Sequence, residues 1–539
     1  MMKKNLGRKR LALLLSVAMV VTFMPNLAFA DTGKEAAKTE VPAAEMAFVD
    51  MPQNWSTAAL KNAVSNGLIS GYDVNGKKYI KPVGNLTRAE MATIVNRGFG
   101  ATEKAELKGV TDVTAKAWYA PELQKAVKMG TFKLDRLMRG DSSITRQEAF
   151  TVLARAFKVT CKDNQKALAK FTDGTAVAAY AKDAMGGLIE GGYLAGASGK
   201  LNPTGNITRA EFAKIMDSLV VQYVTKASTV TKVADKGNVM VNVPGVTLKG
   251  VTINGDLIVG DGVGTGDLNL DSVKVTGRTV VRGGGVDSIK ITGTSDIQSI
   301  VVDNMNNEVR IYTAEGVTVQ KVEADKAVVL DGNFTNVTVI GAGADITVSK
   351  GSKVETMTLS KSAESPKVDV QGSVGTLATA APNTKIEVSG KVNSIAATAD
   401  AKGTAVNVGK TGEATSVVTA APNTKIEVSG TVGSIGAATG STGTTVTANA
   451  GSKVDSITAT NPKDVVSNGA GKVPPTTTAP ADKPVAPPTV TEKPGETPKL
   501  DVPPVKPTPP PATGGGSGGG GTDLVAEAKT ALNGAITKA

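Results

Sequence analysis

The sequence contains no histidine and a single cysteine, Cys161, among 539 residues. Without histidine, the chain cannot form a Ser-His-Asp triad, a Cys-His pair or a His-ligated zinc site. A single cysteine allows no internal disulfide, and we expect Cys161 to be a small buried apolar side chain. We therefore predict no metal site and no cofactor, and any catalysis would have to use carboxylates, Ser, Lys or Arg.

Aromatic residues make up only 4% of the chain, and they are unevenly distributed. Two of them lie in the first thirty residues, fifteen lie between Phe48 and Tyr223, and only Tyr312 and Phe334 follow. Residues 45–225 are therefore predicted to form a conventional globular core. Residues 226–471, which are rich in Gly, Val, Thr and Ala, must pack in another way.

The first thirty residues have the features of a secretory signal peptide. Basic residues precede an apolar run from Leu11 to Phe23, and Ala28-Phe29-Ala30 provides a cleavage site. We therefore expect a secreted chain that begins at Asp31, with no further segment suited to cross a membrane. The net charge of +11 falls to +6 without the five basic residues of the leader. That modest excess suits an anionic surface polymer and does not argue for nucleic acid.

The C-terminal part is predicted to be a spacer. Many prolines and then a glycine run occupy residues 472–521, which favours an extended, disordered Pro/Gly-rich linker. Residues 522–539 place Leu524, Ala528, Leu532 and Ile536 on one face of a short helix. This helix has no closing signal, which would suit the start of a further domain, and the sequence leaves open whether the chain continues beyond Ala539.

A short motif occurs three times in the N-terminal region. Leu86-Thr87-Arg88-Ala89-Glu90 returns as Ile144-Thr145-Arg146-Gln147-Glu148 and as Ile207-Thr208-Arg209-Ala210-Glu211. Recurrence at this period predicts three copies of one supersecondary unit, each with a helix, a loop and a second helix. We place copies one, two and three at residues 45–105, 106–166 and 167–225.

The motif itself has a local structural explanation. Thr-x-x-Glu is a capping box, in which the Thr hydroxyl and the Glu carboxylate satisfy each other's backbone amides at a helix start. The pairs are Thr87 with Glu90, Thr145 with Glu148, and Thr208 with Glu211. The arginine is not explained in this way, because a cation at a helix N-terminus opposes the helix dipole. It serves either an external anion or an ion pair with a carboxylate of the neighbouring copy.

These motifs together resemble the S-layer homology (SLH) domain in triplicate. The resemblance rests on Phe48-Val49-Asp50, Trp55, the Gly67 to Tyr72 segment and the Thr-Arg-Ala-Glu motif, and covers about a third of the chain. It implies an all-α, pseudo-three-fold bundle that binds secondary cell-wall polysaccharide, often pyruvylated, in grooves between the copies. The binding residues carried over are Asp50, Trp55, Tyr72, Arg88, Asp112, Trp118, Arg146, Asp173 and Arg209, with Tyr180 in the place of a third Trp.

The copies depart from the family pattern in different ways. Copy two has Met129-Gly130-Thr131 in place of Gly-Tyr, and copy three has Gly191-Gly192-Tyr193, in which the Tyr is shifted. We therefore expect one or two grooves to be degraded and copy one to bind best. The alternative for Trp55 and Trp118 is a place in the hydrophobic core, as is common for aromatic residues.

A second repeat occupies residues 226–471. Glycines recur every 18 to 22 residues from Gly332, and Thr379 to Val388 is repeated unchanged as Thr419 to Val428, forty residues later. Short β-branched runs between such glycines predict a parallel β-helix, or β-solenoid, with coils of about twenty residues. Residues 245–300 have a similar pattern and are expected to begin the same solenoid.

The sequence leaves more than one function open. Asp256, Asp261, Asp267 and Asp271 suggest either a carboxylate or calcium site or, as we prefer, ordinary Asp-Gly turns. We expect a non-enzymatic surface-layer protein of a Gram-positive-type cell envelope, in which the solenoid is a rigid rod. Self-assembly of such a protein is left open. The alternatives are an SLH-anchored polysaccharide lyase or hydrolase and an adhesin.

Overall fold

The computed structural model describes residues 48–305, 308–479, 484–491 and 499–501. The predicted signal peptide, the segment 522–539 and most of the predicted linker lie outside these residues. In the part of the chain that is described, no helix has both the length and the apolar character that a membrane span requires.

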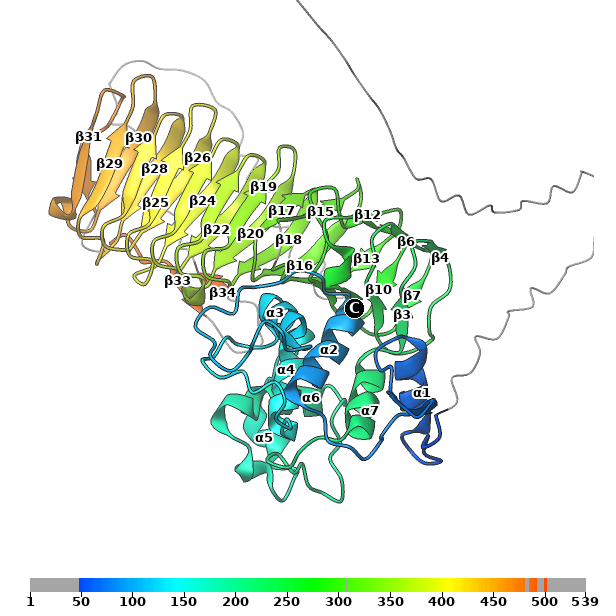
Figure 1. The fold of residues 1–539 in the computed structure, drawn as a ribbon. Coiled ribbons are helices and arrows are strands. Elements are labelled where there is room, and N and C mark those ends of the chain that lie inside the picture. The colour runs from blue at the N-terminus through cyan, green and yellow to red at the C-terminus, as the bar shows by residue number, and fades with distance from the viewer. Residues whose placement is uncertain (1–47, 306–307, 480–483, 492–498, 502–539) are drawn as a thin grey trace, which may run out of the picture. The chain divides into compact units, whose positions relative to one another are not determined.

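The N-terminal region contains pairs of helices and one β-hairpin (Figure 1). The helices are α1 (Thr57–Ser65), α2 (Arg88–Phe99), α3 (Ala120–Lys128), α4 (Arg146–Ala156), α5 (Asn164–Leu168), α6 (Lys182–Glu190) and α7 (Arg209–Leu219), with 3-10 turns η1 (Gly174–Ala176) and η2 (Ala179–Ala181). Strands β1 (Tyr72–Val74) and β2 (Lys77–Tyr79) pair antiparallel. The expected all-α bundle is therefore wrong in detail, because the Asn75-Gly76 turn, with both residues at positive φ, allows a hairpin.

One apolar cluster forms the core of this region. Phe99, Phe150 and Phe212, on α2, α4 and α7, are fully buried in it. The first helix of copy one begins at Thr57, so Trp55 precedes the helix and stays outside the core. Cys161 is half-buried, contrary to expectation, and burial raises the pKa of its thiol to about 11.

The following region is a parallel β-solenoid, with strands of successive coils stacked in register (Figure 1). One sheet has fourteen strands: β3 (Gln222–Val224), β5 (Val239–Val241), β8 (Leu257–Val259), β11 (Thr279–Val281), β14 (Ser299–Val302), β16 (Thr318–Ala324), β18 (Asn333–Val339), β20 (Lys353–Leu359), β22 (Ser373–Thr379), β24 (Lys391–Ala397), β26 (Glu413–Thr419), β28 (Thr431–Ala437), β30 (Lys453–Ala459) and β32 (Thr476–Thr478).

A second sheet, of thirteen strands, faces the first across the core. Its strands are β4 (Thr229–Val230), β6 (Val246–Lys249), β9 (Leu268–Asp271), β12 (Lys290–Thr292), β15 (Val309–Thr313), β17 (Val328–Asp331), β19 (Asp345–Val348), β21 (Lys367–Val370), β23 (Lys385–Val388), β25 (Ala405–Val408), β27 (Lys425–Val428), β29 (Thr444–Ala448) and β31 (Val465–Gly469). A short third sheet joins β7 (Thr252–Ile253), β10 (Lys274–Val275) and β13 (Asp296–Ile297).

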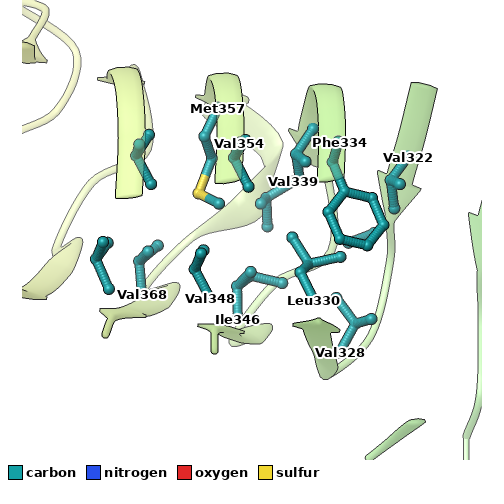
Figure 2. Packing of buried hydrophobic residues seen from close by; sticks show 14 of the residues in the cluster. Val322, Val328, Leu330, Phe334, Val339, Ile346, Val348, Val354, Met357 and Val368 are labelled. Carbon is teal, nitrogen blue, oxygen red and sulfur yellow. The ribbon is translucent and has the colours of Figure 1, made fainter. Parts of the chain in front are cut away.

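Alternating side chains explain how the coils stack. In β23, Ile386 and Val388 point inward, while Lys385 and Glu387 point outward. Ile386 lies in register with Val368 of the coil before and Val406 of the coil after. Figure 2 shows this core, with Phe334 and Met357 on one sheet facing aliphatic residues of the other. Each coil therefore buries its apolar residues against its own opposite strand and its two neighbours.

The duplicated decapeptide adopts the same turn twice. Asn383 and Asn423 both have positive φ, at 55° and 58°, a conformation that asparagine tolerates better than other non-glycine residues. Beside each turn, two buried threonine hydroxyls lie 2.8 Å apart, Thr379 with Thr384 and Thr419 with Thr424. Identical sequence thus gives identical local hydrogen bonding in two coils.

The linker prediction needs a correction at its start. Residues Thr476–Thr478 form β32, which pairs with β30 as a further coil. Val485 then packs on the solenoid beside Val418 and Ala438. Strands β33 (Thr489–Thr491) and β34 (Lys499–Asp501) form an antiparallel pair. Strands β32 and β33, which consist of threonine and valine, can form next to prolines because proline is tolerated at the ends of strands.

A buried ion cluster joins the helical region to the first solenoid coils. Arg282, only 1% exposed, pairs through Nε with Asp261 at 2.9 Å and through Nη1 with Asp303 at 2.6 Å. Its Nη2 donates to the carbonyl oxygen of Met129, at the end of α3. Lys158 then bridges Asp303 and Asp325, at 3.1 and 2.7 Å.

Apolar contacts accompany this ion cluster. Met240 of β5 and Ile258 of β8 belong to the hydrophobic cluster of the helical region, although their strands belong to the solenoid. The first solenoid coils therefore complete the core of the helical region.

Replacing Arg282 by alanine should lower the free energy of unfolding by about 3–5 kcal/mol, because buried Asp261 loses its ion-pair partner and Asp303 keeps only Lys158. The control is Arg310→Ala, which breaks a more exposed pair with Asp331 and should cost at most about 1 kcal/mol. Urea unfolding of the full chain, followed by circular dichroism, measures both. Equal losses in the two variants would contradict the role given to Arg282.

Candidate functional site

The three helix starts predicted from the repeated motif meet in a closed ring of backbone hydrogen bonds. The amide of Leu86 donates to the carbonyl oxygen of Ile207, that of Ile207 to Ile144, and that of Ile144 to Leu86, at 3.0 to 3.1 Å. All three residues are fully buried. The three copies of the motif therefore occupy cyclically equivalent positions around one point.

Each motif also forms the capping box that its sequence indicates. The side chains of Thr87, Thr145 and Thr208 accept from the backbone of the Glu three residues later, and each Glu side chain accepts from the Thr amide. The next two amides of each helix donate to the neighbouring copy; those of Arg88 and Ala89, for example, bond to Ser142 and Gly140. The helix N-termini are thus satisfied partly within a copy and partly across copies.

The motif arginines make the ion pairs between copies that we considered as one alternative. Arg88 pairs with Glu148 at 3.0 Å, Arg146 with Glu211 at 2.6 Å, and Arg209 with Glu90 at 3.6 Å. The carboxylate of the capping box therefore offsets the unfavourable position of the neighbouring copy's arginine. Within the described residues, Nη2 of each arginine donates no hydrogen bond, so each guanidinium keeps donors for a ligand.

The predicted aspartates hold backbone loops. Asp50 accepts from the amides of Ile80 and Lys81, at 2.7 and 2.8 Å. Asp112 and Asp173 make the equivalent pairs of bonds to the loops of their own copies. Each loop then presents a carbonyl oxygen to an arginine Nε of the preceding copy, as Ile80 does to Arg209. These carboxylates therefore hold the loops of their own copies, and the ligand role carried over for Asp50, Asp112 and Asp173 stays a prediction.

The predicted aromatic residues are on the surface. Trp55 is 61% exposed, Trp118 is 60% exposed and Tyr180 is 56% exposed. Each stands two residues before the helix of its copy, α1, α3 or α6, so the three positions are equivalent. The core alternative for the tryptophans is thus wrong. Large exposed aromatic faces beside polar residues are typical of binding surfaces.

A pocket of about 220 Å³, which we call groove one, lies beside copy one. Its lining includes Tyr72 and Glu90 of copy one, Trp118 of copy two and Arg209 of copy three. Arg209 lies over the Tyr72 ring, 4.9 Å from its centroid, and its Nη1 is 3.2 Å from the Tyr72 hydroxyl. That hydroxyl donates to Glu90, and burial together with this bond raises the pKa of Tyr72 to about 12.

A second pocket, of about 390 Å³, lies beside copy three, and we call it groove three. Its lining includes Glu211 and Lys214 of copy three, Arg146 of copy two and Trp55 of copy one. The remaining junction contains Arg88, Glu148 and Tyr180. Burial is the main cause that raises the pKa of Tyr180; the negative charge of Glu148 raises this pKa further, and the positive charge of Arg88 lowers it. Each junction therefore combines an aromatic residue, an arginine and a glutamate.

Every such combination draws on all three copies. Arg88 of copy one therefore lies at the junction that contains Glu148 of copy two and Tyr180 of copy three. The shifted Tyr193 is equivalent to Leu68 and not to Tyr72, because Gly67 and Gly192, with φ of 70° and 75°, end corresponding helices. Tyr72 consequently has no tyrosine counterpart in copy three.

Sequence reasoning missed Arg97 and Arg155. Arg97 lines groove one, and its Nη1 donates to the carbonyl oxygen of Leu68 at 3.3 Å. Arg155 donates in the same way to Thr131, also at 3.3 Å. Both follow the motif arginine of their copy by nine residues, a spacing that could have revealed them.

The acidic cluster of the solenoid is paired with basic residues. Asp256 pairs with Arg278, Asp261 with Arg282, Asp267 with Lys290 and Asp271 with Lys249. Each partner belongs to an adjacent coil, so these pairs connect the stack. Such paired carboxylates are poorly suited to act together on a glycosidic bond.

Comparison with known families agrees with this geometry. The family model described as the S-layer homology domain matches residues 47–92 and 170–213. Two segments of this chain are therefore similar to the S-layer homology domain. The SLH matches cover the segments of copies one and three that contain Trp55, Tyr72 and the motif arginines Arg88 and Arg209.

Relatives with SLH-type similarity include surface-layer proteins and an enzyme. The chain is 27% identical over 226 residues to the surface-layer 125 kDa protein of Lysinibacillus sphaericus, which is 41% of this chain and 18% of that one. It is 26% identical over 193 residues to the S-layer protein of Bacillus thuringiensis subsp. finitimus (35% and 23%) and 28% identical over 177 residues to exoglucanase XynX of Acetivibrio thermocellus (32% and 16%). The chain thus spans less than a quarter of the length of each.

Asp112 and Asp173, which we call the clamp aspartates because each holds a backbone loop, should make the stability of the helical region sensitive to acid. Burial opposes the effect, but the amides of Arg139 and Met138 hold the pKa of Asp112 below its ordinary value of 3.8, and the pKa of Asp173 is lowered similarly. Because the folded pKa is the lower one, this stabilisation is complete above pH 3.8 and is lost as the pH falls through the folded pKa.

Asp112→Asn and Asp173→Asn should therefore lower stability at neutral pH by about 1 kcal/mol each and reduce its loss in acid. Asp345→Asn, at an exposed pair with Lys367 on the solenoid, is the control and should change neither. Thermal unfolding between pH 2 and 7 measures all three. An unchanged acid dependence in the clamp variants would refute the assignment.

Proposed function

We propose that this protein is a non-enzymatic cell-surface protein of the S-layer type, held non-covalently to secondary cell-wall polysaccharide by three SLH copies. The observation that carries the proposal is the position of Trp118 and Trp55, exposed at the two pockets formed between copies. An aromatic face can stack on a sugar ring, while the arginine and glutamate beside it supply hydrogen bonds to hydroxyl and acidic groups. A pyruvylated sugar would provide such an acidic group.

The solenoid then serves as a rod that begins at the anchor. Its first coils share an ion cluster and a core with the SLH region, so motion of one relative to the other is restrained. The enzymatic alternative receives less support, because the four clustered aspartates are paired with Lys or Arg. The similarity to an exoglucanase and an amylopullulanase covers 16% and 9% of those proteins and fits the shared SLH segments.

Co-sedimentation of the full chain with purified cell walls tests the anchor. Trp118→Ala and Trp55→Ala should each weaken binding several-fold, and the double variant should lose nearly all of it, because two sites on one chain bind with avidity. Because Trp55 and Trp118 are exposed, their replacement by alanine should change the free energy of unfolding little. Val286→Ala is the matched control, since Val286 is exposed to a similar degree, 62%, but lies on the solenoid.

Walls stripped of their secondary polysaccharide should bind neither the wild-type chain nor the variants. If the double Trp variant bound as well as wild type, or stripped walls bound equally, the grooves would not be the attachment site. The function would then have to be sought on the solenoid.

A further inference from the structure

Groove one and groove three are built from corresponding residues. Glu90 and Glu211 occupy the same position, as do Arg209 and Arg146, and Trp118 and Trp55. Position by position, the linings therefore match in the aromatic face and the buried ion pair. The differences between the two grooves are confined to a few side chains, and two of them change the chemistry.

The first difference is the place of a second cation. In groove one the second cation is Arg97, which lies on α2 nine residues after the motif arginine Arg88. Thr93 lies one helical turn before Arg97. In groove three the residue types differ, because Lys214 occupies the position of Thr93 and Ser218 that of Arg97 on α7. Four residues of helix correspond to about 6 Å, so the cation moves along the groove by that distance.

The second difference is the size of the grooves. In groove one the Tyr72 ring lies against Arg209, and its hydroxyl contacts both Arg209 and Glu90. The equivalent residue of copy three is Ala197, which lines groove three. Groove one, with this ring, has a volume of about 220 Å³, and groove three, with Ala197 here and Tyr193 in the place of Leu68, has about 390 Å³. Groove three therefore has room that Tyr72 occupies in groove one.

We propose that the two grooves recognise different portions of an acidic polysaccharide. Groove one takes a single acidic sugar unit, whose carboxylate lies between Arg209 and Arg97. Groove three takes a longer segment, whose carboxylate lies one helical turn nearer the start of α7, beside Arg146 and Lys214. This inference rests on the proposed wall-binding function and adds to it that the grooves are not interchangeable.

Electrostatics supports the assignment of the second cations. Nη2 of Arg209 and of Arg146 donates no hydrogen bond in the described part of the chain, so a ligand carboxylate can use it. Arg97 is exposed on the rim, where its Nη1 holds the loop carbonyl of Leu68 and the Ser70 hydroxyl at 3.3 and 3.4 Å. Lys214 is likewise exposed, with Asp217 at 3.5 Å. A cation at the rim selects an acidic substituent without being required for the fold.

Single-groove chains make the proposal testable. Both chains carry Tyr180→Ala, which removes the aromatic residue of the third junction. In this background Trp55→Ala leaves groove one, and Trp118→Ala leaves groove three. The probes are oligosaccharides released from wall polysaccharide, separated by length, each with its carboxylates intact or chemically reduced to alcohols. Isothermal titration calorimetry should show that Trp55→Ala binds the shortest acidic fragment and longer ones within about threefold. Trp118→Ala should prefer the longer fragments by about tenfold, a difference of about 1.4 kcal/mol.

The second cations, Arg97 in groove one and Lys214 in groove three, are then replaced in the Trp55→Ala and Trp118→Ala chains. Arg97→Ser should reduce the preference for carboxylate over alcohol in the Trp55→Ala chain to the part that Arg209 supplies, and Arg97→Lys should keep most of the preference. In the Trp118→Ala chain the same loss should follow Lys214→Thr, and Arg97→Ser should have no effect. Tyr72→Ala should make groove one accept longer fragments better.

The outcomes separate this inference from the function on which it rests. If both single-groove chains bind the same fragments with the same carboxylate preference, the grooves are equivalent and the inference is wrong, while wall attachment stands. Equal effects of Arg97→Ser on both backgrounds would also overturn it. If the wild-type chain binds no fragment and does not sediment with walls, the wall-binding function fails and the inference fails with it.

Discussion

Three backbone hydrogen bonds, which close a ring through Leu86, Ile144 and Ile207, are the constraint on which the rest of the N-terminal region depends. They bring three helix starts to one point, so each capping glutamate comes within reach of the next arginine. Grooves arise where one copy's loop, the next copy's aromatic residue and the previous copy's arginine meet. A binding site of this kind cannot exist in a single copy, because no copy contains all of its parts.

Local patterns in the sequence were sufficient to predict the helix starts. The Thr-x-x-Glu spacing predicts the capping boxes because the interaction is confined to four residues. The destination of Arg88 could not be predicted in the same way, since it lies in another copy, 60 residues away at Glu148. The aspartates show the same limit: a carboxylate near a loop could bind a ligand or the loop, and only the fold shows that Asp50 holds Ile80 and Lys81.

The solenoid was predictable for a related reason. Its coils contact their immediate neighbours, so a repeat of about twenty residues carries most of the information about register. What the repeat could not show is its junction with the helices. Asp261, Arg282 and Asp303 are spaced by 21 residues, which places them in successive coils. The repeat does not predict that Arg282 also bonds to Met129 after α3, or that Asp303 pairs with Lys158. The preference for ordinary Asp-Gly turns missed that Asp256, Asp261, Asp267 and Asp271 each pair with a basic residue of an adjacent coil.

The duplicated decapeptide has a consequence for how this chain can change in length. Thr379 to Val388 and Thr419 to Val428 occupy the same position in two coils, with the same turn and the same threonine contact. Recombination between the two copies would remove or add forty residues, a pair of coils, and restore the same sequence at the junction. Because adjacent strands lie about 4.8 Å apart, each event would shorten or lengthen the stack by about 10 Å. The length of the solenoid could therefore evolve in even steps, while the helical region stays unchanged.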